Sequence, residues 1–75
     1  DEKEVSKEII KVLKDIAKVQ QKVIEVSQRL ASVLRADDDN VVKRALEEYE
    51  KILEELRELN KEIEKLTDKY RKVTS

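Results

Sequence analysis

Apolar residues recur along nearly the whole chain at steps that alternate between four and three residues. This pattern is a heptad repeat, which is typical of a helix that packs along a seam. In the first half of the chain, the seam positions are Val5, Ile9, Val12, Ile16, Val19, Val23, Val26, Leu30 and Val33. We assign Ile9 to heptad position a and Val12 to position d. The repeat therefore predicts an all-α chain built from long helices.

The repeat is interrupted only at residues 36–40, Ala-Asp-Asp-Asp-Asn, and then resumes. In the second half, the seam positions are Val42, Ala45, Tyr49, Ile52, Leu56, Leu59, Ile63, Leu66, Tyr70 and Val73. We expect a single domain over residues 1–75, with a helix at about 2–35, a turn at about 36–39 and a helix at about 39–73. Asp37 or Asp38 caps the second helix, because Asp favours such positions. With Asp37 as the cap, Ala36 and Val41 would stand in hydrophobic-staple positions.

A turn this short makes the two helices antiparallel, so the sequence predicts a helical hairpin. Antiparallel packing places a residues opposite d residues, and the expected layers are apolar. The flanking g positions test this register independently. They pair Lys22 with Glu55 and Arg29 with Glu48. The remaining g pairs are Glu8 with Lys69 and the like-charged Asp15 with Glu62. We call this g side of the hairpin the charged side.

The opposite side of the hairpin carries the e positions of both helices and the b positions of the first. Its apolar residues, here called the apolar side, are Ile10, Leu13, Ala17, Ile24, Ala31, Leu34, Leu46 and Leu53. A large exposed apolar patch marks an interface, so we expect the hairpin to assemble into a multi-chain coiled-coil bundle. The apolar arc spans about 160° on the first helix and about 100° on the second. This difference favours a homotrimer with the first helix inside, ahead of a homodimer. A heterodimer with a matching hairpin and a larger ring with a central channel stay open.

Polar residues interrupt the apolar stripe and the seam. They are Ser6, Gln20, Ser27, Asn60 and Thr67 at e positions, with Tyr49 and Tyr70 in the seam. A buried polar group without a partner costs about 1–3 kcal/mol. One interpretation is a hydrogen-bond network that sets register and partner choice; the other is a set of polar residues at a wet rim. Ser6 and Thr67 lie at one level and can meet, with Tyr70 nearby. Gln20 and Asn60 have no polar partner within the hairpin, so we expect them to bond across the subunit interface.

The amino-acid composition argues against a catalytic or ligand-binding role. The chain has no His, Cys or Gly, and its charged residues, 47 % of the total, fall on the outer faces. The sequence thus predicts no enzyme, no catalytic, cofactor or metal site and no small-molecule substrate. It also predicts a soluble chain, because no apolar run is long enough to span a membrane and the acidic start is wrong for a signal peptide. An RNA-binding hairpin is a lesser alternative, since Lys7, Lys11, Lys14, Lys18 and Lys22 form a basic stripe, but the net charge is only −1 and acids interleave it.

The hairpin without Gly or Pro, the heptads from 5 to 73 and the polar set in the stripe together resemble a known group of proteins. They are similar to computationally designed helical-bundle oligomers with buried hydrogen-bond networks. That resemblance implies two-helix subunits that form homodimers, homotrimers, rings or heterodimers. It further implies a structural role, recombinant expression in a cytoplasm, and no partners other than copies of the chain or a matching designed hairpin.

Overall fold

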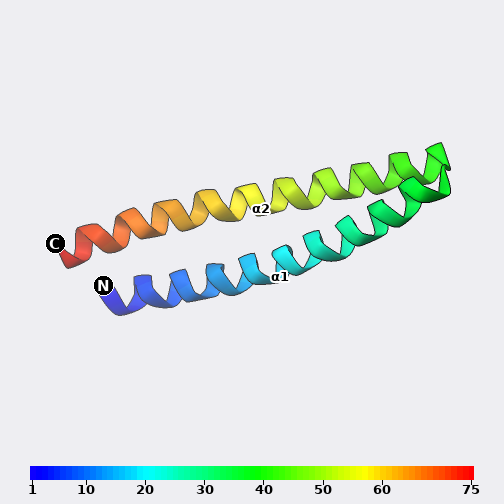
Figure 1. The fold of residues 1–75 in the computed structure, drawn as a ribbon. Helices are drawn as coiled ribbons and strands as arrows, with labels where there is room; N and C mark the ends of the chain where they lie inside the picture. The colour runs from blue at the N-terminus through cyan, green and yellow to red at the C-terminus, as the bar shows by residue number, and fades with distance from the viewer.

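The structure, a computed structural model, describes all 75 residues and consists of two helices joined by a tight turn (Figure 1). Helix α1 runs over Glu2–Ala36 and helix α2 over Asp39–Thr74. The helices lie antiparallel, so the two termini meet at one end of the molecule and the turn forms the other (Figure 1). The all-α prediction is confirmed, and the chain is a helical hairpin.

The start of α1 is capped by the first residue of the sequence. The Asp1 carboxylate accepts a hydrogen bond from the Glu4 backbone N–H at 3.1 Å. Glu2 and Glu4 add negative charge to the first turn, where the helix dipole favours it. Helix α1 therefore begins where capping and charge both favour a start.

The turn consists of Asp37 and Asp38, which adopt different conformations. Asp37 ends α1 in the left-handed region, with φ 58° and ψ 37°, a region that Asp tolerates better than most residues. Asp38 is extended and caps α2, because its Oδ1 accepts from the backbone N–H groups of Asn40 and Val41 at 3.1 and 3.3 Å. The cap is thus Asp38, so Ala36 and Val41 do not occupy the staple positions that a cap at Asp37 would have given them.

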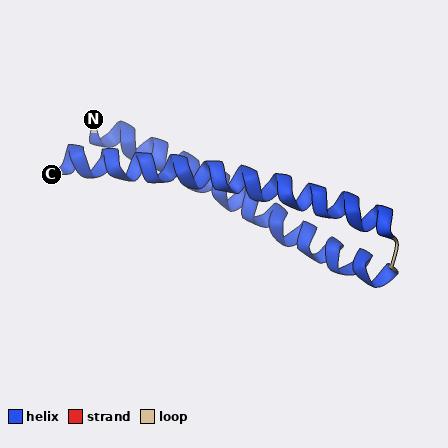
Figure 2. Cartoon of the chain, turned by 90° about the horizontal axis from the view of Figure 1, so that it is seen from above, coloured by secondary structure: helices blue, strands red, loops and turns tan.

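The hairpin is a rod of 55 × 14 × 13 Å with a radius of gyration of 17.0 Å. A compact domain of this length has a radius of gyration of about 11 Å. Figures 1 and 2 show that the helices also wind about one another: they separate towards the termini in one view and towards the turn in the other. Such winding is what a seven-residue repeat imposes on packed helices.

The core is a thin line of small residues between the helices. Only five residues are buried, and they are Val5, Val12, Val19 and Val26 of α1 and Ala45 of α2. All five occupy d positions, whereas the a residues of α1, such as Ile16 and Val23, are half-buried. On a helix surface, d lies beside g and a lies beside e. The a row is therefore open because the e side of the hairpin is uncovered.

Candidate assembly interface

The charged side is closed by ion pairs between the helices. The Arg29 guanidinium donates two hydrogen bonds of 3.1 Å to the two carboxylate oxygens of Glu48. Lys22 Nζ lies 3.9 Å from a Glu55 oxygen. Both pairs were predicted from the g positions and confirm the register of the hairpin. The two other g pairs make no ion pair: Glu8 does not reach Lys69, and Asp15 and Glu62 are both acidic.

The apolar side has no such cover. Large apolar residues on it are 43–56 % exposed: Ile10, Leu13, Ile24 and Leu34 on α1, and Leu46 on α2. Ala17 and Ala31 are also exposed, and Leu53 is half-buried. No hydrogen bond or ion pair between the helices involves an e or b position. The apolar side is therefore uncovered, and four of these five exposed large apolar residues belong to α1.

The polar residues of the stripe divide into two groups. Gln20 and Asn60 are exposed, whereas Ser6, Ser27, Thr67 and both tyrosines are half-buried. No side-chain nitrogen or oxygen is buried without a partner in the single hairpin. Covering the apolar side would remove water from Gln20 and Asn60, and each amide would then need a new partner.

Two of these residues bond differently from the sequence prediction. The Thr67 hydroxyl donates to the Ile63 carbonyl at 2.7 Å, inside its own helix, and not to Ser6. A Thr hydroxyl commonly bonds the carbonyl one turn earlier. The Tyr70 hydroxyl donates to Glu2 at 3.3 Å and so links the two ends of the chain. Sequence reasoning missed Glu2, because it lies on the first turn, outside the stripe.

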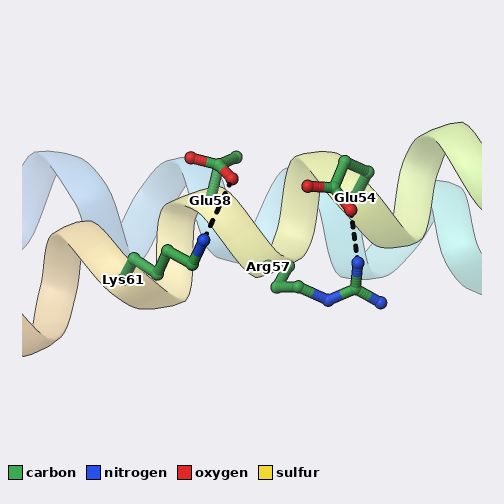
Figure 3. Close-up of polar contacts among 4 residues, drawn as sticks. All are labelled: Glu54, Arg57, Glu58 and Lys61. Carbon is green, nitrogen blue, oxygen red and sulfur yellow. Dashed lines mark hydrogen bonds and ion pairs between the residues drawn. The ribbon is translucent and has the colours of Figure 1, made fainter.

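The outer face of α2 is occupied by ion pairs within the helix. Figure 3 shows Arg57 turned towards Glu54 and Lys61 towards Glu58, with all four side chains on the outer surface. Arg71 and Asp68 form a third pair of this kind at 3.7 Å. In α1 the one comparable pair joins the terminal amino group to Glu4. Helix α2 thus has a polar outer face, and the open apolar surface belongs mainly to α1.

The remaining candidate features are surface features. The basic stripe formed by Lys7, Lys11, Lys14 and Lys18 is exposed on α1. No group of three or more His, Cys, Asp or Glu residues is placed to hold a metal ion. Neither helix contains a segment long and apolar enough to cross a membrane. The surface hollows are open and lined largely by charged residues, such as Glu47, Glu50 and Arg57.

No family model, curated protein or solved structure matches this chain. The apolar side must therefore be interpreted from its own residues.

Proposed function

We propose that this chain is a subunit of a self-assembling helical bundle, with a structural role and no catalytic one. The subunits join through the apolar side, and each subunit's partner is another copy of the chain. The observation that carries the proposal is the run of large apolar side chains left about half exposed along one side of the hairpin. Soluble proteins rarely expose a contiguous apolar patch of this kind unless it binds something.

The surface area of the hairpin supports the same proposal. A compact folded monomer of 8.8 kDa exposes about 4,800 Å². The hairpin exposes 5976 Å², an excess of about 1,200 Å². A standard protein interface buries about 800 Å² on each partner. The excess is therefore large enough for one full interface per chain.

The thin core gives a second reason. Five buried residues, none larger than Val, stabilise a chain of 75 residues. Each ordered residue loses backbone entropy equivalent to about 1–2 kcal/mol, and small scaffolds commonly offset that loss by oligomerising. Assembly would bury the half-buried a residues of α1 together with the apolar side, and so would enlarge the core well beyond the five residues that are buried in the hairpin.

The absence of reactive groups favours a structural role over an enzyme. The chain has neither His nor Cys, and its carboxylates are distributed over outer faces. Acid–base or nucleophilic catalysis needs a positioned pair of such groups in a cleft. The resemblance to designed hairpin subunits supports the structural interpretation as well, and a designed origin is part of the proposal.

Light scattering coupled to size exclusion tests the proposal directly. We expect a mass that is an integer multiple of 8.8 kDa at micromolar concentration, with helicity that falls on dilution as the assembly dissociates. A concentration-independent monomer with a cooperative unfolding transition would contradict the proposal. The same measured mass also tests whether the assembly is the homotrimer that the widths of the apolar arcs favour.

A further inference from the structure

The apolar side of α1 alternates large and small residues from one heptad to the next. Its b positions are Ile10, Ala17, Ile24 and Ala31 in order. The two isoleucines are 52 % and 51 % exposed, and both alanines are exposed. One heptad spans about 10.5 Å of helix, so the surface has ridges at the isoleucines and hollows at the alanines.

The alternation of Ile and Ala along α1 is complementary to the same alternation on a second copy that runs in the opposite direction. In a second copy that runs antiparallel and is centred at Gln20, Ile10 faces Ala31 of the partner subunit. Ala17 then faces Ile24 of the partner subunit. The same centre places Leu13 against Ser27 of the partner subunit, again a large residue against a small one. Opposed large and small side chains fill space at the density of a protein core. A copy running parallel at the same level would face Ile with Ile and Ala with Ala, which alternates crowding with gaps.

The charges on α2 agree with this centre to within about two residues. Along the rim of the apolar side, the b positions of α2 are Lys43, Glu50, Arg57 and Glu64, alternating in sign, and all four are exposed. With the centre at Gln20, the nearest rim pairs are Lys43 with Glu64 of the partner subunit and Glu50 with Arg57 of the partner subunit. Both pairs attract. A shift by one heptad on α2 would oppose Glu50 to Glu64 of the partner subunit, and both groups are acidic.

Arg57 remains able to make the rim pair. Its guanidinium is already bonded to Glu54 of the same helix (Figure 3). A guanidinium carries five N–H donors, so it can bond a second carboxylate without releasing the first.

We propose that a second copy of this chain covers the apolar side, with its α1 antiparallel on the first α1 about a two-fold axis at Gln20. The inference rests on the proposed function and adds the orientation and register of the partner. A two-fold contact uses the same patch on both subunits, which is what the self-complementary order of α1 requires. The wide apolar arc of α1 then packs on the same arc of the partner subunit, and the charged b positions of α2 lie at a solvated rim. The assembly is accordingly a dimer and not the trimer favoured by the arcs alone.

Spin-label distances test the arrangement, since the chain has no native Cys. We choose two exposed positions on one face of α1, Lys18→Cys and Ser32→Cys. In the antiparallel dimer, the axial separation of paired labels is about 6 Å at position 18 and about 36 Å at position 32. In a parallel ring, both positions give the same axial separation, close to zero.

The outcomes separate this inference from the proposed function. A distance that grows from position 18 to position 32 supports the two-fold dimer. Equal distances in a confirmed oligomer would overturn the two-fold arrangement alone. A monomeric mass for both labelled variants and for the parent would overturn the proposed function as well.

A charge exchange gives a second readout of the register. The Glu50→Arg substitution places a positive charge opposite Arg57 of the partner subunit at two equivalent sites in each dimer. Because these like charges repel, we expect the dimer Kd to rise severalfold at low salt. Combining it with Arg57→Glu restores both attractions and should return the Kd to near the parent value. If the double variant dissociates as readily as Glu50→Arg alone, with helicity unchanged at high concentration, the proposed register is wrong.

Discussion

The two long sides of the hairpin, the charged side and the apolar side, differ in whether their side chains are covered within the single chain. On the charged side, Arg29 and Glu48 bond across the helices and the d-position valines beneath are buried. On the apolar side, no e or b residue bonds across the helices, and Ile10 and Ile24 are half exposed. One side is therefore closed within the hairpin, whereas the other leaves large apolar side chains exposed to solvent.

Different heptad positions of one chain can therefore specify the hairpin and the surface through which we propose that it assembles. The a and d residues set the register of the hairpin. The g residues agree with that register, while the e and b residues of α1 are free to specify a partner. Because ion pairs at exposed g positions contribute only about 0–1 kcal/mol each, most of the stability in an assembly would come from the apolar side.

The largest expected effect comes from a charge placed in the middle of the apolar side. Ile24→Glu would bury an unpaired carboxylate in the interface, at a cost of several kcal/mol, so we expect complete dissociation. Light scattering gives the mass, and circular dichroism should show a large loss of helix on dilution. Ser32→Glu is the control, because it adds the same charge to α1 at an exposed position away from the stripe. Elution of Ile24→Glu at the parent size with unchanged stability would place the interface elsewhere.

The next effect concerns the core row beside the charged side. Val19 is 3 % exposed, and Val19→Ala removes two buried methyl groups and leaves a cavity. We expect the free energy of unfolding to fall by about 2 kcal/mol, measured by urea denaturation at fixed protein concentration. The partial gain in helix propensity is included in that figure. Val73→Ala serves as the control, because Val73 is 46 % exposed at the end of the same seam and its truncation should cost far less.

A polar residue of the apolar side provides a smaller and opposite effect. Asn60→Leu adds apolar area to the stripe, so we expect the thermal midpoint to rise by a few degrees, equivalent to about 1 kcal/mol. If Asn60 bonds across the interface, the same change strands its partner and loosens specificity. Native mass spectrometry should then show more than one oligomeric state. A single unchanged oligomer would assign Asn60 to a solvated rim.

Most of the fold could be predicted because it depends on periodicity, which is visible in the sequence. The two helices and the Arg29–Glu48 pair follow from heptads that run without a fault on both sides of one interruption. The choice between Asp37 and Asp38 as the cap could not be predicted, since both are Asp. It depends on which residue takes the left-handed conformation that reverses the chain.

The polar contacts were harder to predict for another reason. Thr67 lies at the level of Ser6 and could have met it, but its hydroxyl bonds a carbonyl of its own helix. Local bonds of this kind compete with contacts between helices, and periodicity does not reveal which one prevails. The apolar side could be named residue by residue from the sequence, whereas its occupant depends on a second molecule and stays a prediction.

The smallest effect, and the sharpest test of the charged side, is the coupling between Arg29 and Glu48. The geometry is bidentate, but the two side chains are 54 % and 45 % exposed, so water screens the pair. A double-mutant cycle with Arg29→Gln and Glu48→Gln should give a coupling free energy of about 0.5 kcal/mol that declines with added salt. The matched cycle at Lys22 and Glu55, where the nitrogen and oxygen are 3.9 Å apart, should give less, because a single long contact lacks the second hydrogen bond. A coupling above about 2 kcal/mol at Arg29 and Glu48 would mean that assembly buries the charged side. In that case the roles assigned to the two sides would be reversed.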